Sequence, residues 1–306
     1  MVAMQQPQLR GELRTHESLA RYTTWRVGGE ARQLYRPADV EDLSLFLSRL
    51  AEEEVIHFIG LGSNLLVRDD GVAGTVILTQ GMLDNIEQLD TNRLGIEAGV
   101  TSAKVARTAA RAGMAGAQFL SGIPGTIGGA LAMNAGCFGG EIWSLVESVT
   151  VINRYGELVQ RNPDEYEVGY RSVKGPGSEQ DEWFVATTLK LERGDSEELL
   201  GENRQLLEKR AASQPTQLPN AGSVFRNPPG DHAARLIEHC GLKGHCIGKA
   251  CVSDKHANFI VNSGGATATE IEQLMEHVAQ QVMAKFGIAL EREVRVIGNP
   301  VSGGAL

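Results

Sequence analysis

One stretch of the chain decides its fold, and it reads Ser121-Gly122-Ile123-Pro124-Gly125-Thr126-Ile127-Gly128-Gly129-Ala130-Leu131-Ala132-Met133-Asn134-Ala135-Gly136. It carries no acidic or basic side chain, and its glycines lie too close together for a regular helix or strand. Glycine leaves main-chain N–H groups uncovered, and successive uncovered N–H groups form concave sites for anions such as phosphates. The stretch therefore predicts either a phosphate-binding loop or a buried turn in which the backbone packs closely.

A second glycine loop, Gly60-Leu61-Gly62-Ser63-Asn64, follows an apolar run at 55–59 that predicts a buried strand. No third glycine opens a helix after it, and an apolar run at 65–67 continues instead, which excludes the Gly-x-Gly-x-x-Gly loop of a Rossmann fold. Ser63 and Asn64 place hydrogen-bonding side chains beside exposed backbone. The pattern favours a nucleotide-contacting loop over a polar turn between two strands.

Length and charge exclude several classes of protein. A chain of 306 residues predicts two or three domains. A formal net charge of -9 argues against nucleic acid or an anionic membrane surface as the main partner. No apolar run is long enough to span a bilayer, and the first residues lack the pattern of a signal peptide. We therefore expect a cytoplasmic protein without membrane insertion and without a nucleic-acid partner.

The four cysteines lack the paired spacing of a zinc site, although histidines lie between and beside them. They are Cys137, Cys240, Cys246 and Cys251. We expect free thiols that are buried or half-buried, and no metal.

Strand and helix patterns alternate throughout the chain, which predicts an α+β fold. A composition shift at 193–196 precedes a charged helix over 196–212, which we interpret as the connector to a new domain. Thr269 and Glu272 have the spacing of a capping box for a helix that Gly287 ends. A final strand is expected over 288–297.

Six motifs, in order, resemble the UDP-N-acetylenolpyruvoylglucosamine reductase (MurB) family and together span nearly the whole chain. They are Gly60-Leu61-Gly62-Ser63-Asn64-Leu65-Leu66-Val67, Ile123-Pro124-Gly125-Thr126-Ile127-Gly128-Gly129, Met133-Asn134-Ala135-Gly136, Tyr170-Arg171-Ser172, Gly222-Ser223-Val224-Phe225-Arg226-Asn227-Pro228 and Glu293-Val294-Arg295-Val296-Ile297-Gly298. No insertion resembles the tyrosine-bearing loop of one subclass. The resemblance is therefore to the compact subclass that lacks this loop.

The resemblance implies an FAD-binding region of the vanillyl-alcohol-oxidase (PCMH) type, built from two subdomains at 1–80 and 81–196. A C-terminal α+β substrate-binding domain would follow at 197–298, with a tail at 299–306 and a final strand that is a candidate for return to the FAD region. It also implies non-covalent FAD, with NADPH as co-substrate. The implied reaction reduces UDP-N-acetylglucosamine enolpyruvate to UDP-N-acetylmuramate for peptidoglycan, with no obligate protein partner.

Three residues match the catalytic positions of the family, and the chemistry suits their types. Reduction of the enolpyruvyl group develops negative charge beside its carboxylate, where a cation and a hydrogen-bond donor are needed. Arg171 matches the family's arginine, whose planar fork suits a carboxylate or enolate. Glu293 matches its glutamate, which assists only if it is protonated or shares a proton. Ser223 matches its proton donor, and the basicity of the enolate would drive that transfer.

The other site residues follow from the same motifs. The cofactor set is Gly60, Leu61, Gly62, Ser63, Asn64, Leu65, Ser121, Gly122, Ile123, Pro124, Gly125, Thr126, Gly128, Gly129, Asn134, Ala135 and Gly136. The substrate set is Tyr170, Asn227, His256 and Arg295. Two positions depart from the family pattern: Lys249 stands where a second glycine is common, and Cys240 where a small apolar residue is usual. The Lys249 departure bears on the local backbone conformation.

Taken singly, each catalytic residue also fits a plainer role, as a surface arginine, a turn serine or an exposed strand carboxylate. Two other functions are compatible with parts of the pattern. One is another flavoenzyme on the same fold that oxidises a small alcohol or hydroxy acid. The other is a flavin-binding or nucleotide-sugar-binding protein without catalysis. The joint presence of Arg171, Ser223 and Glu293 favours the reductase over both.

Overall fold

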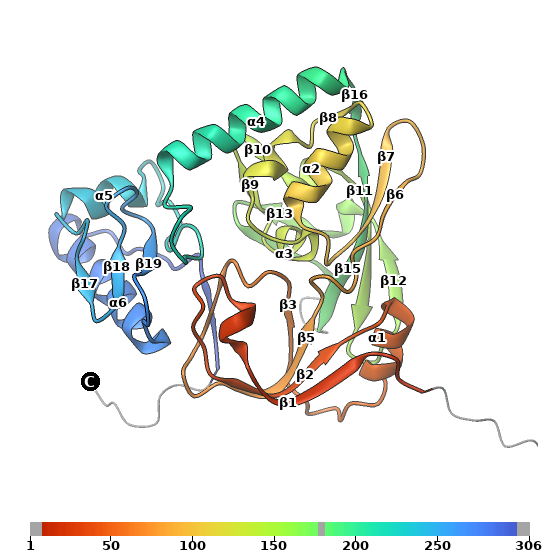
Figure 1. Cartoon of the computed structure of the whole chain (residues 1–306), viewed down its shortest axis with the longest axis horizontal. Helices are drawn as coiled ribbons and strands as arrows, with labels where there is room; N and C mark the ends of the chain where they lie inside the picture. The colour runs from red at the N-terminus through yellow and green to blue at the C-terminus, as the bar shows by residue number, and fades with distance from the viewer. Residues whose placement is uncertain (1–7, 177–180, 299–306) are drawn as a thin grey trace, which may run out of the picture. The chain divides into compact units, whose positions relative to one another are not determined.

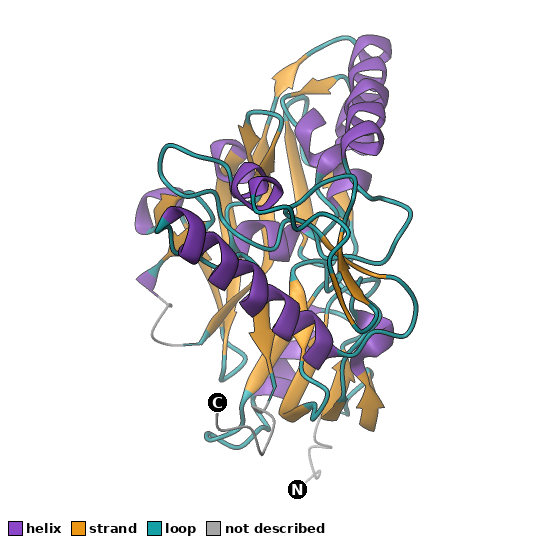
Figure 2. Cartoon of the chain, turned by 90° about the vertical axis from the view of Figure 1, so that its left-hand side faces the viewer, coloured by secondary structure: helices purple, strands orange, loops and turns teal. Residues whose placement is uncertain are grey.

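The computed structural model describes residues 8–176 and 181–298, and strands and helices alternate along this part of the chain (Figure 1). The described residues form two compact units. The first comprises the chain up to Arg14 together with Gln33–Gly60 and Gly74–Leu206. The second comprises Thr15–Arg32, Leu61–Ala73 and the chain from Leu207 onward. The α+β fold expected from the sequence is confirmed, and Figure 2 shows its helices and strands.

The first unit contains a five-stranded antiparallel sheet in the order β12-β11-β15-β7-β6. Its strands are β6 (Ile86–Gln88), β7 (Arg93–Glu97), β11 (Val146–Asn153), β12 (Leu158–Arg161) and β15 (Glu182–Lys190). Two helices, α2 (Ser102–Arg111) and α3 (Ile127–Ala132), share one core with this sheet. Alternate strand residues such as Val149 and Val151 are buried in that core, as the period of two in a strand requires. The sheet thereby supports α3, the helix that begins inside the Ser121–Gly136 stretch.

A second sheet has the order β1-β2-β5-β3. Its elements are β1 (Glu12–Ser18), β2 (Glu30–Arg36), β3 (Ile56–Ile59) and β5 (Val72–Leu78), and the helix α1 (Val40–Leu47) lies between β2 and β3 in sequence. Strand β3 pairs in parallel with β5, from Ile56 opposite Thr75 to Ile59 opposite Leu78. The strand expected at 55–59 is therefore confirmed, and it ends directly at Gly60.

The remaining elements of the first unit are short. They are β8 (Met114–Ala115), β9 (Gly136–Cys137), β10 (Gly140–Glu141), β13 (Glu167–Gly169), β14 (Ser172–Lys174) and β16 (Glu192–Arg193), with the 3₁₀ helices η2 (Gln118–Gly122), η3 (Ile142–Leu145) and η4 (Pro163–Glu165). The charged helix α4 (Ser196–Ser213) follows, within one residue of its expected range. The helix continues past Leu206, the last residue of the first unit, so its final turns belong to the second unit.

The second unit gathers residues from three distant stretches around one core. Its elements are η1 (Leu19–Tyr22), β4 (Leu65–Val67), α5 (Ala233–His239), β17 (Cys246–Ile247), β18 (Ala250–Val252), β19 (Ile260–Asn262), α6 (Ala268–Phe286) and β20 (Arg295–Ile297). Ile271, Leu274 and Val278 form a buried stripe on α6 at the spacing of a helix. The buried indole of Trp25 belongs to the same core and donates to Ile260 O at 2.8 Å.

The start of α6 differs from the sequence prediction. The capping box is formed by Thr267 and Glu270, not by Thr269 and Glu272, so the predicted pair is wrong by two residues. The reason is a tertiary contact, because the Asp69 carboxylate accepts hydrogen bonds from Ala268 N and from Thr269 N and Oγ1. The C-terminal prediction is confirmed, since Gly287 ends the helix in the left-handed region at φ 68°. The strand expected over 288–297 is confined to its last three residues as β20.

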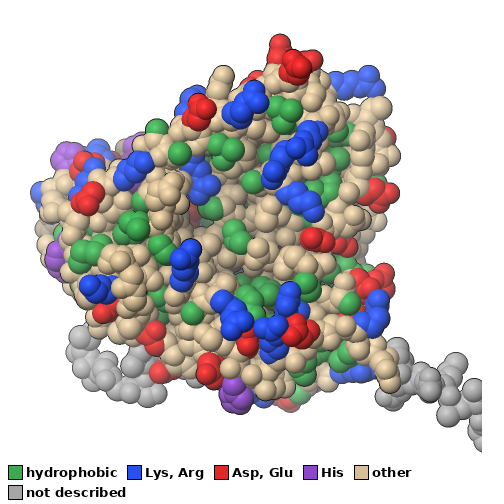
Figure 3. All heavy atoms as spheres, viewed as in Figure 1, with side chains coloured by type: hydrophobic (Ala, Val, Ile, Leu, Met, Phe, Trp, Pro, Cys, Tyr) green, Lys and Arg blue, Asp and Glu red, His purple; other side chains and the backbone are tan. Residues whose placement is uncertain are grey.

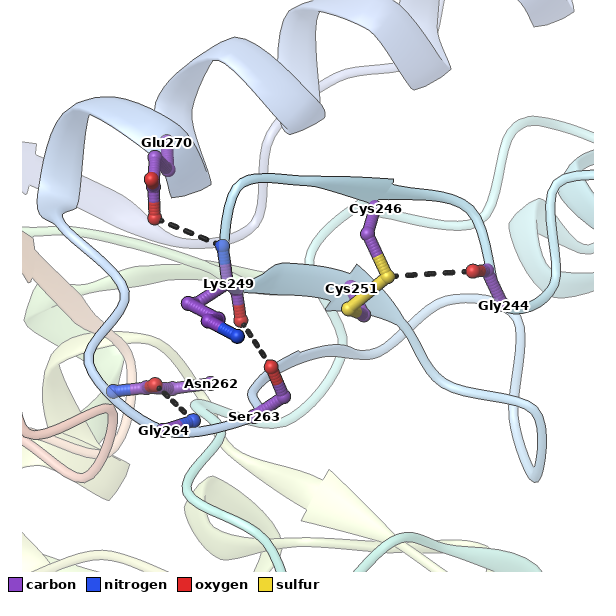
Figure 4. Close-up of a disulfide and its surroundings, with 8 residues drawn as sticks. All are labelled: Gly244, Cys246, Lys249, Cys251, Asn262, Ser263, Gly264 and Glu270. Carbon is purple, nitrogen blue, oxygen red and sulfur yellow. Dashed lines mark hydrogen bonds between the residues drawn. A yellow bond between two sulfur atoms is a disulfide. The ribbon is translucent and has the colours of Figure 1, made fainter.

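Cys246 and Cys251 form a disulfide, so the prediction of free thiols is wrong for this pair (Figure 4). They are direct partners across the β17–β18 hairpin, with Cα atoms 4.1 Å apart. A spacing with four residues between the two cysteines does not by itself indicate this hairpin register. Cys240 remains a half-buried thiol as predicted, and so does Cys137, whose Sγ donates to Phe119 O.

The same hairpin explains why lysine can stand at position 249, where a second glycine is common in the family. Ile247 pairs with Ala250, so Gly248 and Lys249 form a two-residue turn (Figure 4). Gly248 has φ 56°, and a Cβ atom there would lie 1.9 Å from Glu270 Oε1. Only the first position of this turn needs glycine, as in type II′ hairpins. Lysine is therefore compatible with the second position.

Reduction of the Cys246–Cys251 bond is expected to lower the free energy of unfolding by about 2 kcal/mol, because the ring that it closes is small. Strand β18 stays paired to β19 after reduction, so the hairpin keeps its neighbours. Urea denaturation of oxidised and reduced protein measures the difference, with Cys240→Ser as the control. Titration of the denatured, unreduced protein should find two of the four thiols; four titratable thiols would contradict the bridge.

No described helix is long and apolar enough to cross a membrane. Within residues 8–176 and 181–298, no cluster of His, Cys, Asp or Glu has the composition to hold a metal ion. On the face drawn in Figure 3, basic and acidic side chains are interspersed.

Candidate active site

The two glycine loops meet in the first unit. A Cβ atom on Gly60, the first residue after β3, would lie 2.1 Å from the Thr126 hydroxyl. Thr126 is the residue before α3, and its backbone bridges to Thr101, the residue before α2. Any side chain at position 60 would collide with Thr126. Close contact between the loops therefore requires glycine at position 60.

The glycines of the Ser121–Gly136 stretch serve two purposes. Gly128 packs closely, since its N–H donates to Ala98 O at 2.9 Å and a Cβ atom would lie 2.9 Å from Ala98 Cβ. Gly129 is exposed, and a Cβ atom there would meet only Thr126 Oγ1, at 3.8 Å. The two interpretations left open by the sequence thus apply to different residues of the stretch. Gly129 leaves open space above the backbone at the start of α3.

The surroundings of this stretch fit a dinucleotide cofactor. The buried Ser102 hydroxyl, at the start of α2, has no hydrogen-bond partner among the described residues. Ser102 N donates to Gly125 O at 2.9 Å, which places the serine directly beside the loop. An unpartnered buried hydroxyl beside open glycine backbone is what a phosphate-rich ligand would satisfy. The residues present therefore fit FAD.

The rest of the first glycine loop belongs to the second unit. Asn64 Nδ2 donates to Glu293 O at 3.1 Å, and Asn64 O accepts from Arg295 N at the same distance. Strand β4 then pairs in parallel with β20, from Leu65 opposite Arg295 to Val67 opposite Ile297. The final strand thus returns to residues 65–67, directly after the loop. The end of the loop and the Glu293 segment are held as neighbours.

Ser223 and Glu293 come together in the same unit. Glu293 N donates to Val224 O at 2.8 Å, and Phe225 forms an antiparallel bridge with Arg292. The two segments therefore run side by side although they lie far apart in the sequence. The Ser223 side chain is half-buried, and its hydroxyl makes no hydrogen bond within the described part of the chain.

A buried asparagine that sequence reasoning missed fixes the Ser223 segment. Asn258 O accepts from Val224 N at 2.9 Å, while its amide accepts from Phe225 N at 3.0 Å and donates to Phe225 O at 2.8 Å. The only sequence signal is a polar residue inside the apolar run 257–261. Asn258 sets the backbone directly after Ser223.

His256 lies two residues before Asn258, and burial lowers its pKa, with the nearby Lys243 as a smaller contributor. Asn258 N donates to His256 Nδ1 at 3.3 Å, which requires an unprotonated Nδ1. The neutral imidazole therefore supports the loop that carries Asn258. The ring also packs edge-on against Phe259, with centroids 4.7 Å apart.

Arg171 lies at the tip of the β13–β14 hairpin, in the first unit. Its backbone adopts φ 53°, which is uncommon for a residue with a side chain. The guanidinium donates to Asn134 O at 3.3 Å and to Gly136 O at 2.9 Å, and it lies 5.2 Å from the centre of the Tyr170 ring. Arg171 is therefore held against the C-terminal end of the Ser121–Gly136 stretch.

The Asn134 side chain makes its hydrogen bonds within the protein. That side chain is buried, and its amide donates to Glu141 Oε2 at 2.8 Å and to Gly169 O at 3.2 Å. Its Oδ1 accepts from Trp143 N at 3.4 Å. These contacts join the glycine stretch to the hairpin that carries Arg171. The Asn134 amide is thus engaged within the protein.

The remaining predicted residues lie at the surface. Asn227 is exposed, and its Oδ1 accepts from Ala233 N at the start of α5. Tyr170 is exposed at the hairpin tip, and Arg295 is exposed on β20. The structure brings Ser223, Glu293 and Asn64 together within the second unit, whereas Arg171 and Tyr170 belong to the first.

The second unit also contains a cavity of about 410 Å³. It is lined by residues 214–218, by the disulfide and by the start of the loop that carries His256. Lys255 lines it too, and its ammonium donates to Ala211 O. The exposed surface of the lining is mostly apolar and includes a few polar groups, which is the usual character of a small-molecule site.

The meeting glycine loops and the fold define a flavoprotein oxidoreductase. Residues 31–161 match the family described as "FAD binding domain", and residues 214–297 match "UDP-N-acetylenolpyruvoylglucosamine reductase, C-terminal domain". The chain belongs to the UDP-N-acetylenolpyruvoylglucosamine reductase family, as the following relatives show.

Curated relatives that carry that name include proteins from Alkalilimnicola ehrlichii and Legionella pneumophila. The one from Alkalilimnicola ehrlichii is 53% identical over 292 residues, covering 95% of this chain and 97% of the relative. The one from Legionella pneumophila (strain Corby) is 55% identical over 290 residues, covering 94% and 93%. The crystal structure of the Thermus caldophilus reductase (MurB) matches with a TM-score of 0.79 at 36% identity, covering 94% of this chain and 99% of that one. The family and fold expected from the sequence are confirmed.

Proposed function

We propose that Arg171, Ser223 and Glu293 are the catalytic residues of this enzyme. The enzyme reduces UDP-N-acetylglucosamine enolpyruvate to UDP-N-acetylmuramate for peptidoglycan, with NADPH as the reductant. FAD, when bound, would supply the redox chemistry that couples oxidation of NADPH to reduction of the enolpyruvyl double bond. The observation that carries the proposal is the pairing of the Ser223 and Glu293 segments through Glu293 N and Val224 O.

The chain would hold FAD mainly through backbone. Residues 60–65 and 121–129 supply the two glycine loops, and the contact between Gly60 and Thr126 supports their joint use. The Ser102 hydroxyl is a further group that the cofactor would satisfy. Ala135 and Gly136 lie where the Gly136 carbonyl holds Arg171, so that end of the stretch serves both cofactor and catalytic arginine.

The protein's own groups manage charge and protons. Arg171 stabilises the negative charge that develops on the substrate carboxylate and its neighbouring carbon. Ser223 donates a proton to that carbon, and its hydroxyl has no competing partner among the described residues. Glu293 is protonated or shares a proton, so that its carboxyl group assists the enolate and does not repel it. The proton that reaches the carbon moves from Ser223 Oγ, which is afterwards reprotonated from solvent.

The substrate contacts remain proposals from the motif match. Tyr170, Asn227, His256 and Arg295 are assigned to substrate, with Asn227 and Arg295 supported by their exposure in the second unit. The apolar cavity supports binding of a small molecule by this unit. We place the enzyme in the cytoplasm, where charged nucleotide substrates are available without crossing a membrane.

A steady-state assay of NADPH oxidation tests the function. FAD-loaded enzyme should oxidise NADPH when UDP-N-acetylglucosamine enolpyruvate is present, and should release FAD on denaturation. Small alcohols and hydroxy acids should give no turnover, which separates this activity from an oxidase on the same fold. FAD-loaded protein that fails to oxidise NADPH with the enolpyruvyl substrate would overturn the proposal.

A further inference from the structure

One carboxylate in the second unit serves two arginines. Glu272 accepts from Arg68 Nε and Nη2, each at 3.0 Å, and from Arg292 Nη1 at 3.1 Å. Its side chain is only 16% exposed, and the Arg68 side chain is 25% exposed. A bidentate, partly buried pair of this kind holds its geometry better than an exposed surface ion pair. Glu272 is available for it because Glu270 forms the helix cap instead.

The two arginines lie at the ends of functional segments. Arg68 directly follows β4, and its Nη1 donates to Gly298 O while its backbone N donates to Ile297 O, both at 3.0 Å. Arg292 immediately precedes Glu293. Glu272 therefore fastens the chain beyond β4 to the chain before β20, across the parallel pair that these strands form.

Glu293 lies between two anchors as a result. On one side, Asn64 Nδ2 holds the Glu293 carbonyl at 3.1 Å. On the other side, Arg292 is held by Glu272 and, at 3.2 Å, by the more exposed Glu276. The two arginines lower the pKa of Glu272, Arg68 more than Arg292, so this carboxylate stays ionised at neutral pH.

Glu272 is not needed to hold its own helix. Its neighbours Ile271, Leu274 and Met275 are fully buried and anchor α6 in the core. Loss of the carboxylate charge would remove the counter-ion that Arg68 and Arg292 share and leave Arg292 with the more exposed Glu276, which would loosen Arg292 before it released the helix. The effect should therefore be local to the Glu293 segment.

We propose that Glu272 is a positioning residue, which sets the Glu293 segment against the glycine loop through Arg68 and Arg292. The inference rests on the proposed role of Glu293. It assigns to Glu272 no contact with substrate or cofactor. Arg68 and Arg292 come from different segments. The Glu272 carboxylate, which binds both, therefore sets the position of one segment along the other.

The test is Glu272→Gln in the FAD-loaded enzyme, with Glu276→Gln as the matched control that leaves Arg68 and Glu272 paired. We expect reoxidation of the reduced enzyme by substrate to slow by about 10- to 100-fold in Glu272→Gln, the scale of a misplacement of about 1 Å. Bound FAD, measured by its absorbance after gel filtration, and the rate of flavin reduction by NADPH should not change. Glu272→Asp should recover part of the lost rate.

Glu293→Gln, measured alongside, separates this inference from the proposed function. Slow reoxidation in Glu293→Gln but normal reoxidation in Glu272→Gln would overturn the positioning role alone. Normal reoxidation in Glu293→Gln would overturn the role of Glu293 and with it this inference. Equal loss in both half-reactions of Glu272→Gln, together with loss of FAD or a lower Tm, would mean that the network only maintains the fold.

Discussion

Replacement of Ser223 by alanine should slow reoxidation of the reduced enzyme by substrate by about 10²–10⁴-fold, the usual contribution of a positioned proton donor. Reduction by NADPH should keep its rate, because that step needs no proton from Ser223. The backbone around the serine is fixed by Asn258, so removal of one half-buried hydroxyl should leave the segment in place. Rapid mixing, with flavin absorbance recorded, measures the two half-reactions separately.

Two further variants make the Ser223 result specific. Ser213→Ala removes an exposed hydroxyl on α4 and should change neither half-reaction. Ser223→Cys offers a different donor at the same position and should recover part of the rate. If both half-reactions slowed equally in Ser223→Ala, the serine would be a structural residue and not the proton donor.

Arg171→Ala should slow the same second half-reaction by about 10²–10³-fold, because a group that stabilises developing charge is lost. Alanine at φ 53° carries the same backbone strain as arginine, so the hairpin turn itself should persist. The measured loss of rate then reports the contribution of the guanidinium group. Flavin reduction by NADPH serves as the internal reference.

Lys174→Ala provides the matched control for Arg171. Lys174 is an exposed cation on β14 of the same hairpin, and among the described residues it pairs with the exposed Glu167. Its loss should leave both half-reactions unchanged. Arg171→Lys keeps the charge but loses the fork that reaches both Asn134 O and Gly136 O, and should recover little activity. Normal substrate reduction in Arg171→Ala would reject the proposed role.

Composition and spacing predicted the glycine loops because local rules govern them. A residue without Cβ is needed wherever two backbones or a ligand come close, and that need is visible in the sequence. What could not be predicted is which glycine packs against another segment and which leaves the backbone open. Gly60 meets Thr126 and Gly128 meets Ala98, whereas Gly129 stays open, and these differences arise only from the packing of distant segments.

The incorrect predictions share one physical cause. Thr269, the predicted N-cap residue, lies inside the first turn of α6. Its N–H and hydroxyl donate to the carboxylate of Asp69, which lies about two hundred residues earlier. Cys246 and Cys251 became partners through a hairpin register that their spacing does not encode. In each case a contact or strand register that the local sequence pattern does not encode determined the use of a side chain whose type was correctly noted.

The way the chain supplies the second unit has a consequence during synthesis. Trp25 and Leu66 lie in a core whose other members mostly follow Leu207. The ribosome synthesises the N-terminal segments first. These apolar side chains therefore lack most of their core partners until the last third of the chain has emerged. A chain cut off before α5 would leave the Trp25 indole without Ile260 and the glycine loop without β20. The Asn64 end of the glycine loop and the Ser223 segment thus reach their folded arrangement together, only after translation is nearly complete.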